Sequence, residues 1–453
     1  MHSTAIIVLA GLSIGWLTAP VHGQVAVRKQ GFVPYSDEPI KYLSDDIHDP
    51  VARLQQRMNR GDVTLTYEPK GGYLRSVLRN LAIPTNSQTL VFSKTSFQFR
   101  KISPQTPRAL YFNDDVYVGW VQDGKALEVV SFDPRQGAIF YLLDEKQVEH
   151  PVFQRAELDC TQCHVAKATR DVPGVFVRSV FTNPSGTQAG EAASFTTGQE
   201  SPFAERWGGW YVTGTHGGQT HMGNVTVQDK EHPEQIDRAT GANLIDLSKK
   251  IDTAPYLTAD SDIVAHLVLA HQTQMHNLIT LTNYQTRLAI HAAQALSGEA
   301  RQRFQGPAEE LLRYLLFTNE APLTDPITGN TAFAADFAAR GPRDPRGRSL
   351  RDFDLRTRIF NYPCSYLIYS ESFDSLPEPA KSYIYSRLLE VLTGRDYSPD
   401  FAKLTAQSRR AILEILLATK PGLPKEWWIY AKQAHLNPPD NLTQTNARKE
   451  RYQ

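Results

Sequence analysis

The chain has 453 residues, 41% of them hydrophobic and 21% charged, which supplies enough apolar sequence for a sizeable core and argues against wholesale disorder. Lysine plus arginine and aspartate plus glutamate each number 48, so the overall charge gives no support to binding of nucleic acid or of an anionic membrane. The length favours two or three domains over one small domain.

The N-terminus, residues 1–23, has the pattern of a secretory signal peptide. An apolar run extends from Ala5 to Thr18, and Val21 and Gly23 occupy the small-residue positions before a cleavage site. The run is shorter than the roughly 20 residues of a membrane-spanning helix. We therefore expect cleavage before Gln24 and a mature, periplasmic or otherwise exported chain without an integral membrane span. An uncleaved anchor helix is the alternative.

Residues 24–149 are expected to form an α+β domain with an antiparallel β-meander. Helical spacing of apolar residues occurs at 49–58 and 73–81. Alternating or β-rich runs, separated in their later part by turn residues such as Asn113-Asp114 and Asp123-Gly124, predict strands at 89–92, 109–112, 116–121, 127–132 and 138–143.

Residues 150–255 have little periodicity and are rich in Gly, Thr and Gln, so we expect loops wrapped around a cofactor. Residues 256–453 are expected to be an all-α domain. Its predicted helices are 263–296, 308–318, 379–392, 407–418 and 425–431. The whole chain is thus predicted to be of the α+β class, with the loop-rich segment between its two domains.

One short motif carries recognisable chemistry, the run Cys-Thr-Gln-Cys-His at residues 160–164. It is the attachment pattern of covalently bound haem. Two thiols three positions apart can both form thioethers with one porphyrin edge, and the imidazole that follows can bind the iron. A redox-active cysteine pair and half of a zinc site are the alternatives. Cys364 is the one further cysteine in the sequence, so a second CxxC that would complete a zinc ribbon is missing.

In these five residues the chain resembles the c-type cytochromes, and beyond them it is similar at most to large single-haem exported bacterial proteins of unassigned function. The resemblance implies one covalent haem c, thioether bonds at Cys160 and Cys163, proximal iron ligation by His164, and electron transfer. It implies nothing about the remaining residues. A second CxxCH is absent, which argues against the exported two-haem peroxidases.

The distal iron ligand is expected to come from a loop with several glycines, where the candidates are His216, His221 and Met222. The same stretch offers residues that could line a haem pocket, namely Arg206, Trp207, Trp210 and Tyr211, although a structural Gly-aromatic loop is an equal alternative.

The long predicted helix adds three histidines spaced five residues apart, at positions 266, 271 and 276. Steps of five rotate by about 140°, so the three cannot face one site. Of the three, His271 is our choice as an iron ligand, because its neighbours in the sequence are polar. Cys364 is expected to be a buried, inert thiol. The arginine-rich run 340–358 is expected to be a solvated loop, with a docking surface for an acidic redox partner as the alternative.

Three functions fit these observations. The first is electron transfer in the periplasm with an unidentified redox partner. The second is a haem enzyme, peroxidase- or oxidase-like, with an open distal site. The third is a haem-based sensor or partner-binding protein. We favour electron transfer on the sequence, with the enzyme as runner-up.

Overall fold

The computed structural model describes residues 33–190, 192–292 and 298–436 of the chain. From Val33 onward these residues belong to one compact unit. The predicted boundaries near residues 150 and 256 both fall inside that unit. The predicted signal peptide, residues 1–23, lies outside the described residues, as does the end of the helix predicted at 263–296.

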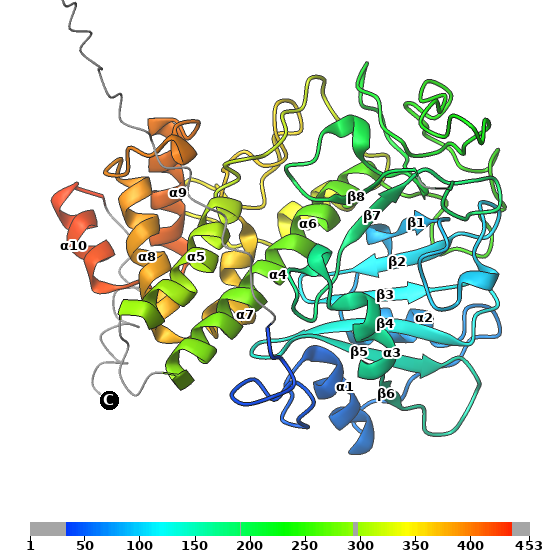
Figure 1. Ribbon diagram of the computed structural model, residues 1–453, viewed down its shortest axis with the longest axis horizontal. Coiled ribbons are helices and arrows are strands. Elements are labelled where there is room, and N and C mark those ends of the chain that lie inside the picture. Colours follow the sequence, from blue (N-terminus) through cyan, green and yellow to red (C-terminus); the bar gives the residue numbers. More distant parts are fainter. Residues whose placement is uncertain (1–32, 191, 293–297, 437–453) are drawn as a thin grey trace, which may run out of the picture. The chain divides into compact units, whose positions relative to one another are not determined.

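An antiparallel sheet with the strand order β6-β5-β4-β3-β2-β1-β9 is the main β element of the described ranges (Figure 1). The meander β1 to β5 and its strand positions confirm the sequence prediction, whereas β6 and β9 were not predicted. The bounds are β1 Thr89–Val91, β2 Arg108–Phe112, β3 Val116–Trp120, β4 Ala126–Asp133, β5 Gly137–Asp144, β6 Phe153–Arg155 and β9 Trp210–Tyr211. Because β9 pairs with β1, the segment 150–255 completes the sheet of the preceding segment.

One face of this sheet is fully buried. Side chains alternate between the two faces of a strand, so every second residue, such as Val118, Val129 and Tyr141, packs into one apolar cluster. Helices α1 (Pro50–Asn59) and α2 (Leu74–Asn80) contribute their apolar sides to the same cluster. Asp49 caps α1 by accepting the backbone N–H of Val51, and it also accepts the hydroxyl of Tyr141 at 2.7 Å.

The opposite face is covered in part by the long helix α4 (Ile263–Ala292). The ring of His276 stacks on Phe132 with centroids 3.9 Å apart. Gly137 has a φ of +75°, and a Cβ there would lie 2.5 Å from the side chain of Thr280, so this close approach requires glycine. Most of α4 is buried, because helices cover its other side.

The helices beyond α4 begin with α5 (Gly298–Leu315), which packs along it. The helices α8 (Glu378–Leu392), α9 (Ala406–Thr419) and α10 (Lys425–Gln433) agree with the predictions at 379–392, 407–418 and 425–431. The helices α6 (Phe333–Ala339) and α7 (Glu371–Asp374) were not predicted. This arrangement confirms the α+β class. Within the described ranges, no helix combines the length and the apolar character needed to cross a membrane.

The arginine-rich run is a loop, as predicted, but it is solvated only in part: Arg343, Arg346 and Arg356 are exposed, whereas other arginines of the run are held inside the protein. Arg351 is buried, with its guanidinium 4.3 Å from the ring centroid of Tyr366 and in an ion pair with Asp114. Arg348 pairs with Asp344 and Glu414. These arginines are engaged within the protein, which leaves their charges little available to a docking partner.

The buried histidines predict that acid weakens the fold. Burial lowers the pKa of His276 to about 4, so the unfolded chain binds a proton near the ordinary pKa of about 6.5 that the folded chain does not bind. This difference lowers the free energy of unfolding as pH falls through that interval, by up to about 1.4 kcal/mol per pH unit.

We expect His276→Gln to reduce the loss of stability between pH 6 and pH 5 by about 1 kcal/mol. Denaturant unfolding at the two pH values measures it, with the exposed His435 replaced by Gln as control. Burial raises the pKa values of Asp115 and Glu145 to about 7, so these two groups stabilise the fold as pH falls. They are present in the native protein and in both variants, so their effect cancels in the comparison. An unchanged pH dependence in His276→Gln would contradict the assignment.

Candidate functional site

The Cys-Thr-Gln-Cys-His motif forms most of a short helix, α3 (Glu157–His164), which follows the edge strand β6 and packs against β5. Residues three apart on a helix lie on neighbouring positions of one side. Cys163 is exposed, whereas Cys160 is partly buried against the main apolar core. The two thiols therefore lie near the surface, where a covalent group can be added without opening the core.

His164 is held in one orientation and one tautomer. Its Nδ1–H donates to the carbonyl oxygen of Gly174 at 2.9 Å, so Nε2 carries the lone pair. Burial lowers the pKa of His164, which keeps the ring neutral. A histidine that binds a metal or haem iron generally shows this pattern, with one ring nitrogen bonded to a carbonyl and the other left to ligate.

A loop anchored by α4 supplies that carbonyl. The backbone N–H of Gly174 donates to the carbonyl of His164 at 3.0 Å. The side chain of Asn277 then holds Val175 from both sides, because it accepts the N–H of Val175 at 3.1 Å and donates to its carbonyl at 2.7 Å. A Cβ on Gly174 would lie 2.1 Å from the Oδ1 atom of Asn277, so only glycine fits here.

Beside His164 the sheet presents a half-covered apolar strip, which we call the open sheet face. It consists of four residues that share the same side of neighbouring strands: Leu110, Gly119, Val130 and Leu142. Leu110, Val130 and Leu142 are each partly exposed. Val130 pairs across strands with Phe140, whose ring centroid lies 5.0 Å from that of His164. Gly119 has no side chain, and the side chains of Leu110, Glu128 and Arg108 lie close around it.

An ion pair lies on the same side of the sheet. Arg108 and Glu128 are 2.6 Å apart and mostly buried. Arg108 lowers and Glu128 raises the pKa of His164, although burial is the larger influence. The Nε atom of Arg108 is buried without a hydrogen-bond partner. The open sheet face therefore combines apolar atoms with one cationic group that can still donate.

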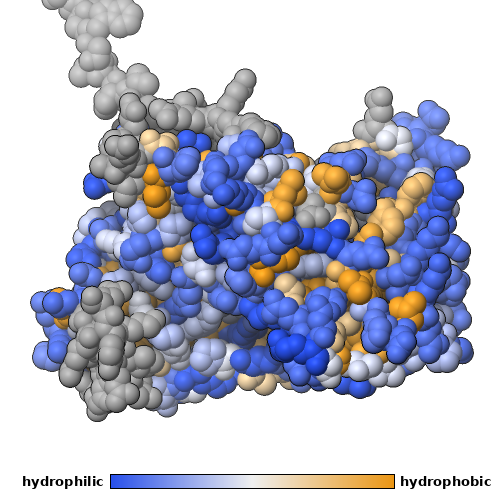
Figure 2. Space-filling model, turned by 90° about the horizontal axis from the view of Figure 1, so that it is seen from below, coloured by the Kyte–Doolittle hydropathy of each residue, from blue (hydrophilic) through white to orange (hydrophobic). Residues whose placement is uncertain are grey.

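Further apolar side chains are exposed on α3 and on the loop before β6. Val148 is 53% exposed, Val152 50% and Leu158 76%. Figure 2 shows apolar atoms gathered mainly on the half of the molecular face that holds the sheet, around a hollowed region. Exposed apolar groups that cluster in this way often mark a surface covered by a ligand or partner.

These residues fit a covalently bound haem. The fit rests on two near-surface thiols, a neutral histidine with Nε2 as its lone-pair nitrogen, and a partly exposed apolar face beside it. No family model, curated protein or solved structure matches the chain. The assignment of the site therefore depends on the sequence motif and on its geometry.

The predicted distal ligands lie elsewhere in the described structure. His216, His221 and Met222 are buried. The two histidine rings contact each other at 4.7 Å, and the sulfur of Met222 accepts the hydroxyl of Ser179 at 3.7 Å. His164 instead contacts Phe140 and Phe176. No described contact joins the two groups, so distal ligation by this loop stays a prediction.

The four residues predicted to line a haem pocket are buried around that same loop. Arg206 donates to the carbonyls of Ser201 and Gln199, and the indole of Trp210 donates to the carbonyl of Arg178 at 2.7 Å. The ring of Trp207 packs on His221 and His266, and the hydroxyl of Tyr211 donates to the carbonyl of Pro104. The described contacts tie these residues to the protein interior and do not include His164.

The histidines of α4 occupy three separate environments, as their spacing predicts. His266 lies against Trp207 and Trp210, and His276 lies against Phe132. His271 donates from Nδ1 to Gln199 at 2.7 Å and accepts from the hydroxyl of Ser365 at 2.8 Å. Both of its ring nitrogens are thus engaged. Cys364 is fully buried, as predicted, and burial raises the pKa of its thiol.

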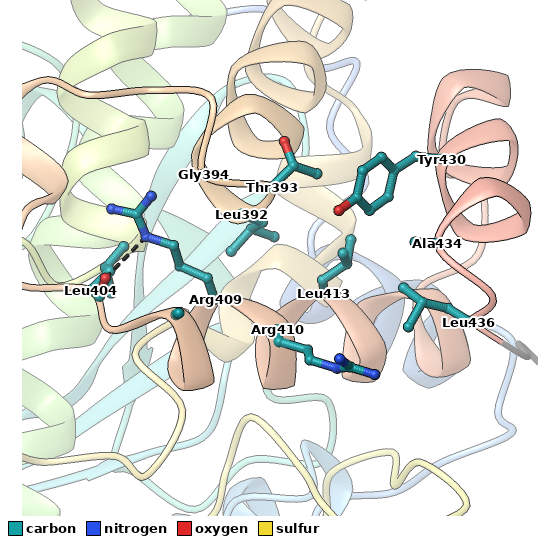
Figure 3. Close-up of a pocket in the computed structure, with 11 residues that line it drawn as sticks. Leu392, Thr393, Gly394, Leu404, Arg409, Arg410, Leu413, Tyr430, Ala434 and Leu436 are labelled. Atoms are coloured by element: carbon teal, nitrogen blue, oxygen red, sulfur yellow. Dashed lines mark hydrogen bonds between the residues drawn. The ribbon is translucent and has the colours of Figure 1, made fainter.

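A cavity of about 310 Å³ lies between α8, α9 and α10, far from the motif in sequence (Figure 3). Arg409 donates there to the carbonyls of Leu404, Val391 and Phe401, as the dashed line in Figure 3 shows for Leu404. Arg410 pairs with Glu414. Both arginines of this cavity already have partners within the protein, backbone carbonyls for Arg409 and Glu414 for Arg410, so we place the functional site at α3.

Sequence reasoning missed Arg108, Gly119, Gly174 and Asn277. A glycine inside a predicted strand is a recognised sign of close approach by a ligand or another backbone, and this signal could have found Gly119. The other three act through contacts between distant segments, which no local pattern shows.

Proposed function

We propose that the chain is an exported c-type cytochrome that carries one haem covalently bound to Cys160 and Cys163, with His164 as the proximal iron ligand, and that it transfers electrons in the periplasm. The observation that carries this proposal is the hydrogen bond from His164 Nδ1 to Gly174, which leaves Nε2 for iron.

The bound haem would supply one-electron chemistry at its iron. The protein would anchor the group by two thioethers, orient His164 through the loop that Asn277 holds, and shield part of the ring on the open sheet face. Arg108 would pair with a propionate, because its Nε atom has no hydrogen-bond partner among the described residues.

Electron transfer is supported by the position of the site at the surface. Cys163 is exposed and Leu158, on the same helix, is 76% exposed, so a haem edge here would be within reach of a partner protein. The exposed side chain of Leu158 offers an apolar contact for that partner. The proposal of export agrees with the predicted signal peptide, because covalent haem is attached outside the cytoplasm.

A haem enzyme is the second candidate, and the Arg108–Glu128 pair is the observation that favours it. Haem enzymes use polar groups beside an open coordination position to assist bond cleavage. The pair lies on the same side of the sheet as His164 and influences the pKa of that residue.

Absorbance spectra of the oxidised and reduced protein, with and without carbon monoxide, test the two candidates. Electron transfer with a closed site predicts a low-spin spectrum that carbon monoxide leaves unchanged. If His216, His221 or Met222 is the distal ligand, its replacement by alanine will give a high-spin haem that binds carbon monoxide. If the unmodified protein is already high-spin and binds carbon monoxide, the haem enzyme replaces electron transfer as the proposed function. If the spectrum changes in His271→Ala and in none of the three loop variants, the distal ligand comes from α4.

Gly119→Leu tests whether the open sheet face supports the haem. A Cβ at this position would already contact Leu110 at 3.3 Å, and a leucine side chain would project from the strip. We expect haem incorporation to fall at least tenfold, measured as haem absorbance per protein in a strain that attaches haem, while Gly119→Ala keeps most of it. Equal incorporation in both variants would place the haem off the open sheet face.

A further inference from the structure

A second polar site lies away from α3, around the ring of His221. Trp207 and His216 contact this ring at centroid distances of 5.2 and 4.7 Å. All three side chains are at least 98% buried. Phe203, which is only half-buried, packs on each of them at 5.0 to 6.0 Å and lies on their outer side.

Each of the three side chains has one nitrogen without a hydrogen-bond partner: Trp207 Nε1, His216 Nδ1 and His221 Nε2. The other histidine nitrogens identify the tautomers. His216 accepts the N–H of Asn243 at Nε2, and His221 accepts the N–H of Gly223 at Nδ1. Because burial keeps the pKa of His221 near 3, its ring is neutral. The unpartnered nitrogen of each histidine therefore carries the hydrogen.

A positive charge lies beside these donors. Arg238 is close enough to lower the pKa of His221, and its Nε atom is also buried without a partner. Arg238 has no ion pair among the described residues. The negative charge of Asp325 raises the pKa of His216, although burial lowers it more. The carboxylate of Asp325 already accepts the backbone N–H of Gly218 at 3.2 Å.

Four N–H groups, one on the His221 ring and three on residues around it, thus have no hydrogen-bond acceptor. Leaving a buried donor unpaired costs about 1–3 kcal/mol each, so a site with four of them favours an occupant that accepts hydrogen bonds. A metal ion does not fit these tautomers, because it needs lone pairs and the unpartnered nitrogens of both histidines carry hydrogens, so this site and distal iron ligation by His216 or His221 exclude each other. We propose that Trp207, His216, His221 and Arg238 form a binding site for a small oxyanion, separate from the CxxCH motif.

The indole N–H signal of Trp207 reports on this site directly. We would record ¹H–¹⁵N spectra of the full mature protein while adding sodium acetate, phosphate or sulfate, with sodium chloride to hold the ionic strength constant. Trp207→Phe assigns the signal. The proposal expects a saturable shift of the Trp207 signal with at least one of the three anions, which also separates a carboxylate site from a phosphate or sulfate site.

The saturable shift gives the Kd of the anion. Arg238→Gln should raise this Kd at least tenfold, because hydrogen bonds to charged groups are stronger than those between neutral groups. The matched control is Arg356→Gln, an exposed arginine whose replacement should leave the Kd within twofold. Trp210→Phe is the control for indole loss, because Trp210 already donates to Arg178. Arg238 is on a half-exposed loop, so this variant is expected to fold. Failure of all three anions to give a saturable shift, or equal Kd values in Arg238→Gln and the native protein, would overturn the proposal.

Discussion

Replacing Cys160 and Cys163 together by alanine will abolish covalent haem. Each thiol contributes one thioether, so either single variant should keep a weaker, partly attached haem and the double variant none. The variants are expressed together with a haem-attachment system. The effect is measured as the haem that remains with the protein after acid-acetone extraction and denaturing electrophoresis.

Cys364→Ala is the matched control for this experiment. Cys364 is fully buried within the main apolar core, and we expect its replacement to leave haem content unchanged. Equal covalent haem in the double variant and the native protein would show that the group is attached at another residue.

Asn277→Ala will destabilise the protein and loosen the loop that orients His164. The side chain is fully buried and holds both backbone groups of Val175, so its removal leaves a buried N–H and a buried carbonyl unpaired. The expected loss in the free energy of unfolding is about 2–4 kcal/mol. In the haem-loaded variant we also expect a fraction of high-spin haem, because His164 would no longer be held in a single orientation.

The control is Asn283→Ala on the same helix. Asn283 is 97% buried, and its Oδ1 atom has no hydrogen-bond partner. Its replacement should therefore cost less than about 1 kcal/mol and leave the haem spectrum as it was. If the two variants lose equal stability and show the same spectrum, Asn277 has no positioning role.

The strands from β1 to β5 could be predicted because their apolar residues alternate and turn residues separate the last four. The helices from α8 to α10 were equally clear from periodicity and from their stop signals. Strand β9, only Trp210 and Tyr211, could not be predicted, because its pairing with β1 joins residues more than a hundred positions apart. The burial of Arg351 was missed for a related reason, since Asp114 and Tyr366 reach it from other segments.

The motif at 160–164 identified the candidate site from sequence because its chemistry is local. Its surroundings were not predictable, because Gly174 and Asn277 meet only through the packing of α4 against the loop after α3. Distal ligation by the glycine-rich loop at 214–223 stays a prediction. In the folded chain His221 of this loop contacts Trp207 and His216, and no described contact joins either histidine to His164.

The most direct test of the account is the intact mass of the protein purified from the periplasm of a bacterium that attaches haem. We predict a single species that begins at or close to Gln24 and carries the additional mass of one haem that survives denaturation. A chain of the same length without that mass, or one that loses its haem on denaturation, would contradict the proposal that Cys160 and Cys163 bind haem covalently.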